Sequence, residues 1–265
     1  MIDAHVHIER GPYTLDWLNQ FITQAIKNGI TEIRFLEHSF RFLEFNRIYR
    51  DIVAHPKYGP YQSDWLKKRC VMPLNSYKEL IATARKTAFP IKVKFGLEVC
   101  YFEGMERETS AVLSGFNWDF LTGSVHWADG WGFDHKKTKA EWLLVDGDAV
   151  SRRYYEIMTR LAESRLFTCL AHPDSIKCFG YSPKSDFSAV YNELAAALKA
   201  GGMEAEISCG LKLNYGLEEL GPCKPLLAAL RANKVKLVTA SDAHAPQDAG
   251  CFIALRPRNP SRRRR

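Results

Sequence analysis

The chain has 265 residues, of which 46% are hydrophobic and 25% charged, a composition typical of a globular enzyme. It contains no apolar run near the roughly 18 residues that a membrane span requires, and the polar start Met1-Ile2-Asp3-Ala4-His5 argues against a signal peptide. We therefore expect a cytoplasmic protein that acts without a membrane.

The net charge of +7 is concentrated at the carboxyl end of the chain. Six arginines lie in the last ten residues, and without them the formal charge of the remainder is +1. We interpret residues 256–265 as a disordered, solvated tail, and the alternative is an anion-binding role. Residues 1–255 are expected to form one domain, and their near-neutral charge argues against a nucleic-acid partner.

Short apolar runs alternate with longer amphipathic segments, which is the pattern of βα units around a parallel sheet. Seven of these runs are predicted to be strands: Ile2–Val6, Glu32–Leu36, Ile91–Leu97, Phe120–Ser124, Leu166–Ala171, Met203–Ile207 and Val235–Ala240. The sequence therefore predicts an α/β fold.

The helices are predicted from apolar residues that recur every three or four positions. In the first helix Leu15, Leu18, Phe21 and Ile22 share one face, and Gly29 is placed to end it. Later helices are predicted over Tyr77–Thr87, Ser151–Ser164, Val190–Ala200 and Lys224–Asn233.

Two connections, 39–76 and 127–146, are unusually long for a barrel of this kind. Long loops in a compact fold are usually lids or binding loops, and the plainer alternative is decoration with no role in the site. The first connection also offers polar side chains that could hold a substrate: Glu44, Tyr49, Asp51 and Tyr61.

Polar side chains collect where the predicted strands end. The ends carry His5 and His7, Glu37 and His38, Glu98, His126, His172 and Asp174, and finally Asp242 and His244. In a β/α barrel these carboxyl ends form the active-site face. Because His, Asp and Glu together bind divalent transition metals, the joint pattern predicts a metal site at the mouth of the barrel.

Each motif alone has a plainer explanation. A single histidine at a strand end, such as His38, is more often a packed or surface residue than a ligand. Six of the eight histidines nevertheless lie at strand ends, while His55 and His135 fall in the two long connections. Core packing does not explain this segregation, because buried polar groups need partners.

In their order along the chain these motifs resemble the PHP (polymerase and histidinol phosphatase) superfamily, within it the monofunctional histidinol-phosphate phosphatases. The resemblance rests on segments 5–12, 37–42, 123–126, 171–174 and 241–244, with support from 130–134 and 176–181. It extends from residue 1 to about residue 250 and is specific as a set. It implies a distorted, TIM-like (β/α)7 barrel that holds three divalent ions, zinc, manganese or iron, and hydrolyses a small-molecule phosphate ester.

The resemblance also implies how ligands are shared among the ions. The implied ligands are His5, His7, Glu98 and Asp242 for the first ion, Glu98, His126 and His172 for the second, and Glu9, His38 and His244 for the third. Closely spaced cations lower the pKa of a shared water and neutralise phosphoryl oxygens, so no Ser or Cys nucleophile is needed. Glu98, as the bridge, and Asp242, beside that water, are the implied catalytic residues.

Phosphate recognition needs cationic side chains with several donors. Arg10, Arg41 and Lys177 directly follow metal motifs. Lys212 stands where the family is expected to show arginine, and Ser208 where it is expected to show asparagine. These four cations are the candidate phosphate-binding residues, and the alternative for each is a solvated surface charge.

The predicted function is hydrolysis of L-histidinol phosphate to L-histidinol and phosphate in histidine biosynthesis. One alternative is a PHP-type phosphoesterase of other specificity, acting on another metabolite phosphate or as a 3'-5' exonuclease. The sequence shows no basic, aromatic-lined track, which argues against the exonuclease. Another alternative is a non-catalytic metal-binding module, which would be expected to have lost ligands.

Overall fold

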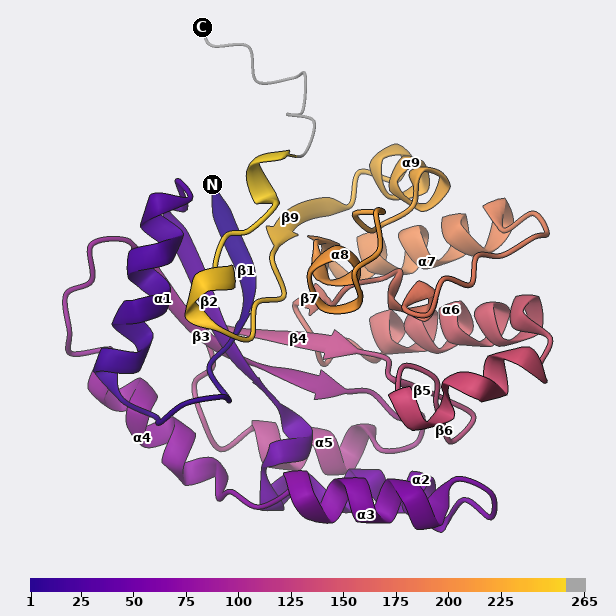
Figure 1. The fold of residues 1–265 in the computed structure, drawn as a ribbon, viewed down its shortest axis with the longest axis horizontal. Coiled ribbons are helices and arrows are strands. Elements are labelled where there is room, and N and C mark those ends of the chain that lie inside the picture. The colour runs from indigo at the N-terminus through magenta and orange to yellow at the C-terminus, as the bar shows by residue number, and fades with distance from the viewer. Residues whose placement is uncertain (256–265) are drawn as a thin grey trace, which may run out of the picture.

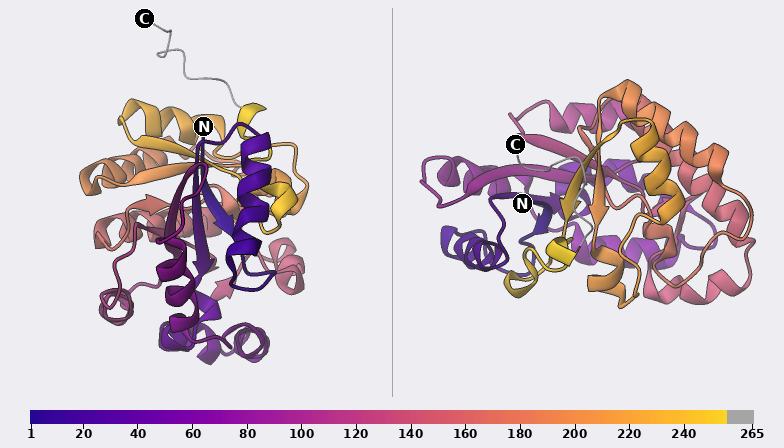
Figure 2. Two further views of the ribbon diagram at one scale, coloured as in Figure 1. Left: turned by 90° about the vertical axis from the view of Figure 1, so that its left-hand side faces the viewer. Right: turned by 90° about the horizontal axis from the view of Figure 1, so that it is seen from above.

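In the computed structural model, residues 1–255 are described, and the expected arginine-rich tail, 256–265, lies outside the described residues. Within residues 1–255, seven parallel strands form one sheet in the order β1-β2-β3-β4-β7-β8-β9. They are β1 (Ile2–His7), β2 (Glu32–His38), β3 (Lys92–Cys100), β4 (Phe120–Ser124), β7 (Cys169–Leu170), β8 (Glu204–Ser208) and β9 (Lys236–Ala240). The sheet curls into a nearly closed barrel with helices outside it (Figures 1 and 2), so the predicted α/β barrel is confirmed.

Helices cover the outside of the sheet because each buries one apolar face. Helix α1 (Leu15–Lys27) begins after Thr14, whose hydroxyl accepts a hydrogen bond from Trp17 N at 3.3 Å. The predicted stop is found at Gly29, where φ is +73°. The other covering helices are α4 (Leu74–Ala84), α5 (Glu106–Leu113), α6 (Gly147–Ser164), α7 (Ser188–Gly201) and α9 (Lys224–Ala232). No described helix has the length and apolar character needed to cross a membrane.

Strand β7 is shorter than the predicted strand Leu166–Ala171. Arg165 precedes that segment with φ of +56°, and His172 follows it with φ of +21°. Neither value is compatible with a strand, so the chain bends on both sides of the two paired residues. The second bend turns the chain at His172, one of the predicted ligands.

Both long connections contain regular structure that the sequence did not predict. Segment 39–76 includes α2 (Arg50–Ala54) and α3 (Gly59–Arg69), and segment 127–146 includes the β5–β6 hairpin (Trp127–Ala128 and Trp131–Gly132) and a 3₁₀ helix, Lys136–Leu143. Gln62 of α3 joins the two segments. Its Oε1 accepts from Trp127 Nε1 at 2.8 Å, and its Nε2 donates to Gly130 O at 2.9 Å. The two connections therefore form one packed wall instead of two open loops.

The barrel closes between β1 and the segment after β9. His7 N donates to Ala243 O at 2.8 Å, and Asp242 N donates to His5 O at 3.0 Å. The buried carboxylate of Asp3 also accepts hydrogen bonds from the chain after β9. Closure thus brings the two ends of the described chain together at the predicted metal site.

The Asp3 carboxylate accepts from Ser241 N at 2.8 Å, from Ser241 Oγ at 2.6 Å and from Gly250 N at 2.8 Å. We predict that Asp3→Ala lowers the free energy of unfolding by about 3 kcal/mol or more, because three buried donors lose their acceptor. Urea unfolding at constant metal concentration measures this loss, with the exposed Asp51→Ala as the control. A loss no larger than that of the control would contradict the closing role of Asp3.

Candidate metal centre

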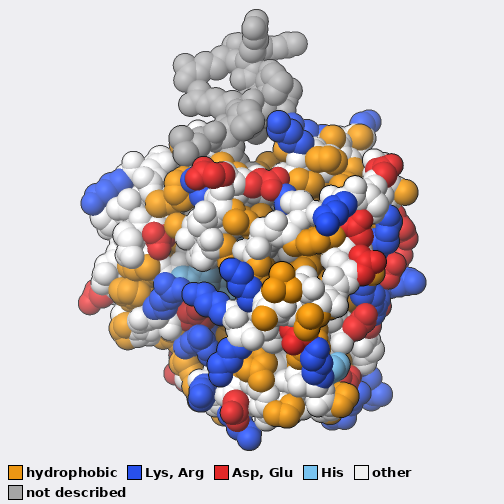
Figure 3. All heavy atoms as spheres, turned by 45° about the vertical axis from the view of Figure 1, so that its right-hand side comes forward, with side chains coloured by type: hydrophobic (Ala, Val, Ile, Leu, Met, Phe, Trp, Pro, Cys, Tyr) orange, Lys and Arg blue, Asp and Glu red, His pale blue; other side chains and the backbone are white. Residues whose placement is uncertain are grey.

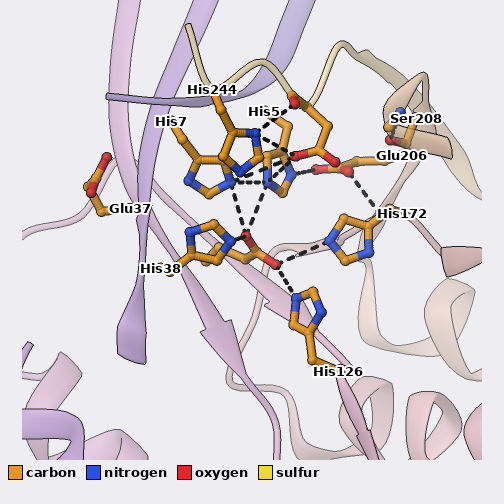
Figure 4. Close-up of polar contacts among 12 residues, drawn as sticks. His5, His7, Glu37, His38, His126, His172, Glu206, Ser208 and His244 are labelled. Atoms are coloured by element: carbon orange, nitrogen blue, oxygen red, sulfur yellow. Dashed lines mark hydrogen bonds and ion pairs between the residues drawn. The ribbon is translucent and has the colours of Figure 1, made fainter. Parts of the chain in front are cut away.

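The strand ends bring all nine predicted ligands to one place at the barrel mouth, and Figure 4 shows how the histidines among them point toward one another. They are His5 and His7 on β1, Glu9 just after it, His38 on β2, Glu98 on β3, and His126, His172, Asp242 and His244 after β4, β7 and β9. His5, His7 and Glu98 have no exposed surface. The sequence therefore predicted which side chains meet, and their binding of metal remains a proposal.

Glu98 lies at the centre of this cluster. The Nε2 atoms within 3.2 Å of its carboxylate oxygens belong to His5, His7, His38, His126 and His172. A carboxylate offers about four lone-pair sites, so five imidazoles cannot all donate well-formed hydrogen bonds to it. The arrangement is that of ligands around shared cations.

Other contacts in the cluster also fit divalent ions. The Nε2 atoms of His5 and His7 lie 2.9 Å apart, and the buried Nδ1 atoms of His7 and His172 have no hydrogen-bond partner within residues 1–255. The groups whose ligand atoms lie within 4.8 Å of one another are His5–His7–Asp242, His5–Glu98–His172 and His7–His38–His244. Imidazole and carboxylate donors of this kind suit zinc, manganese or iron.

Glu9, the predicted ligand with the weakest motif, lies between the two histidines of the third predicted set. Its Oε2 is 3.2 Å from His38 Nδ1, and its Oε1 is 3.7 Å from His244 Nε2. Burial raises the pKa of Glu9, but the charges of the neighbouring histidines outweigh burial and lower this pKa well below its usual value. The carboxylate is therefore ionised and available to a cation.

Burial and mutual charges set the pKa values of the clustered groups. Burial raises the pKa of Glu98, but the charges of His38 and His5 outweigh burial and hold this pKa well below its usual range. Burial lowers the pKa of His5, but Glu206 and Glu98 outweigh burial, so this pKa is well above its usual value. Burial and the charge of His38 hold the pKa of His7 well below its usual value. Divalent ions would replace the protons, so metal binding should release them.

Carboxylates behind the cluster orient the rings of His5 and His126 and hold the backbone of His172. Glu206 Oε1 is 2.8 Å from His5 Nδ1, while its Oε2 accepts from His172 N at 2.9 Å. Asp134 Oδ2 is 2.6 Å from His126 Nδ1. Such partners fix the ring and its tautomer. Sequence reasoning missed both roles, although the two acidic residues inside the predicted strand 203–207 were a signal for Glu206.

Asp242 is held in an uncommon backbone conformation, with φ of +60°. Asn214 Nδ2 donates to its Oδ2 at 2.8 Å and to its carbonyl oxygen at 3.1 Å. A Cβ atom at Gly210 would lie 2.2 Å from the same Oδ2, so glycine there makes room for the carboxylate. Backbone strain of this kind is concentrated at functional sites.

A cavity of about 680 Å³ opens from the cluster and is large enough for a small metabolite. Helix α3 and segment 127–143 supply its aromatic wall, which includes Tyr61, Trp65 and Trp127. Figure 3 shows Lys and Arg side chains gathered beside a hollow in which histidine is visible. The cations that line the cavity are Arg10, Arg41, Lys68, Arg69, Lys136 and Lys137.

The structure brings two of the four predicted phosphate-binding residues, Arg10 and Arg41, to this cavity. Lys177 and Lys212 are not among the described residues that line it. Lys177 is buried and paired with Asp174 at 3.5 Å, and Lys212 lies 3.1 Å from Glu218. These ion pairs account for the placement of both lysines without a contact to phosphate.

Of the polar side chains expected from segment 39–76, Tyr61 lines the cavity. Glu44 instead accepts a hydrogen bond from Leu74 N at 2.8 Å, and Tyr49 is buried against Ser39. Asp51 is exposed and does not line the cavity. Segment 39–76 therefore contributes mainly aromatic and cationic groups to the site.

The two histidines outside the strand ends also differ. His55 lies away from the cavity lining, and its Nδ1 accepts from Lys57 N and Tyr58 N, each at 3.2 Å. His135 lines the cavity beside Asp134, with its Nδ1 against the hydroxyl of Tyr61. Only His55 of this pair suits a control for metal binding.

Residues 3–209 match the PHP domain family. The chain belongs to the PHP domain family. A Deinococcus radiodurans protein named "Probable histidinol-phosphatase" is 27% identical over 261 residues, which cover 96% of this chain and 90% of that protein. With the His, Glu and Asp clusters, the family makes this chain a metal-dependent phosphoesterase of the PHP type.

Two solved structures share the fold. A candidate histidinol phosphatase of Listeria monocytogenes has a TM-score of 0.76 at 18% identity, covering 96% of this chain and 99% of its own. The histidinol phosphate phosphatase of Lactococcus lactis, crystallised with zinc, L-histidinol and phosphate, has a TM-score of 0.65 at 19% identity, covering 92% and 86%. At these identities the likeness supports the PHP barrel.

We predict that Glu98→Gln lowers turnover of a phosphate ester by at least about a hundredfold and reduces bound metal. An amide can neither compensate the repulsion between neighbouring cations nor accept from as many imidazoles. Turnover and elemental analysis of the purified variant measure the two effects, with His55→Ala as the control that keeps both. Near wild-type turnover with full metal content would exclude the bridging role.

Proposed function

We propose that this protein hydrolyses L-histidinol phosphate to L-histidinol and phosphate, using three divalent ions held by the nine clustered ligands. The observation that carries the proposal is the Glu98-centred cluster at the floor of a cavity lined by three arginines and several aromatic rings. The Deinococcus relative named for this activity and the Lactococcus structure with L-histidinol and phosphate support the choice of substrate.

Divalent ions in this cluster would lower the pKa of a bound water and neutralise negative charge on the phosphoryl oxygens. Glu98, His5 and His7 would hold neighbouring ions close together. Glu206 and Asp134, behind the ligands, keep the imidazole rings oriented. The buried, preformed arrangement would thus need little reorganisation during the reaction.

The residues around the cluster would complete the chemistry. Arg10 and Arg41 donate hydrogen bonds to the phosphoryl oxygens, because their planar guanidinium groups match phosphate geometry. As the ester P–O bond breaks, the proton that the attacking water loses must reach the leaving alkoxide, and we assign its transfer to Asp242. The aromatic wall formed by Tyr61 and Trp65 contacts the imidazole of the substrate.

One observation favours an alternative substrate within the same reaction class. Lys68, Arg69 and Lys136 line the cavity and form no ion pair with any residue in 1–255. These charges suit a metabolite phosphate that carries a second anionic group, whereas histidinol carries a cationic amine. A comparison of substrates decides between the two.

We predict that kcat/KM for histidinol phosphate exceeds that for a generic aryl phosphate by about a hundredfold or more. A site with polar and aromatic groups placed for the amine and imidazole leaves those groups unpaired when the ester lacks them. Phosphate release measured over a panel of esters, including doubly anionic ones, tests this. Equal values for the two esters, or a preference for doubly anionic esters, would reject the histidinol assignment.

A further inference from the structure

We infer that Glu37, which belongs to none of the ligand sets, is a positioning residue that holds Arg41 in place to bind phosphate. The inference rests on the proposed function, because it takes Arg41 as a phosphate-binding residue. Glu37 precedes His38 on β2, and alternation along the strand turns the two side chains in opposite directions. Figure 4 shows Glu37 apart from the histidine cluster, and its side chain is fully buried.

Within residues 1–255, the groups that form hydrogen bonds or an ion pair with the Glu37 carboxylate all carry N–H or O–H donors. Its Oε1 accepts from Ile8 N at 2.8 Å. Its Oε2 accepts from the Tyr13 hydroxyl at 2.9 Å and lies 3.3 Å from Arg41 Nε. Ile8 and Tyr13 fix the carboxylate to the segment after β1, so it is a rigid partner for Arg41.

The guanidinium of Arg41 is held along one edge. Nε lies 3.3 Å from Glu37 Oε2 in an ion pair without hydrogen-bond geometry, and Nη2 donates to Met72 Sδ at 3.2 Å. Nη1 instead lies 3.8 Å from Glu9 Oε2, on the side of the metal-binding cluster. The side chain is only 15% exposed, so Glu37 and Met72 occupy its inner edge and leave its outer edge for the cavity.

Glu9 also approaches Arg41, but it cannot be the residue that fixes it when a cation is bound. A carboxylate that binds a cation has less negative charge available for a second partner. Glu37 lies outside the cluster, so its interaction with Arg41 persists in the metal-loaded protein. A guanidinium can bind phosphate through two parallel hydrogen bonds, and fixing its plane beforehand removes an entropic cost of binding.

The test measures the affinity of the metal-loaded protein for inorganic phosphate by calorimetry. Glu37→Gln keeps an acceptor for Ile8 N and places an amide that can donate to the Tyr13 hydroxyl oxygen, but it removes the charge next to Arg41. We expect Glu37→Gln to weaken phosphate binding about tenfold and Arg41→Ala to weaken it at least as much. The double variant should bind phosphate no more weakly than Arg41→Ala alone, because Glu37 acts through Arg41.

Glu204→Gln is the matched control, since it breaks a partly buried ion pair with Arg34 (2.7 Å) at the start of β8 and should leave phosphate binding unchanged. Additive losses in the double variant, unchanged affinity in Arg41→Ala, or loss of metal from Glu37→Gln would overturn the inference.

If Glu37→Gln does not fold, Arg41→Lys decides the matter. It keeps the charge but loses the fixed guanidinium, so wild-type phosphate affinity in this variant would overturn the inference and about tenfold weaker binding would support it. Failure to hydrolyse histidinol phosphate would count against the proposed function alone, because the test measures binding of inorganic phosphate.

Discussion

The buried carboxylate of Glu98 is the interaction on which the rest of the site depends. Five imidazole nitrogens lie within 3.2 Å of its two oxygens, more than a carboxylate can accept as hydrogen bonds. Such a concentration of polar groups without solvent is costly unless cations or protons neutralise it. The fold must therefore hold these groups together. Bound metal should raise the free energy of unfolding and so offset part of that cost.

The barrel meets this requirement by closing at the site itself. Strand β1 supplies the first two histidines, and the segment after β9, more than two hundred residues later, supplies Asp242 and His244. Asp3 joins the two segments through three short hydrogen bonds. Stability and function are linked here, because a loss of closure would separate His5 and His7 from Asp242.

The sequence was sufficient to predict the strands, the barrel and the nine side chains that meet, because strand ends and metal motifs coincide. It was insufficient for groups whose roles depend on three-dimensional contacts. Glu206 and Asp134 act through His5 and His126, and Glu37 faces away from the cluster. Lys177 follows a metal motif but pairs with Asp174. The short, polar helix α3 has little amphipathic pattern, so its place in the cavity wall could not be predicted.

We propose that divalent cations hold the cluster around Glu98 together. Elemental analysis of the purified wild-type protein under metal-replete conditions, repeated after chelation, can decide this. We expect more than one equivalent per chain, about three when fully loaded, of zinc, manganese or iron, and loss of phosphatase activity when they are removed. One equivalent or less, or full activity after complete removal of metal, would show that cations do not hold the cluster together.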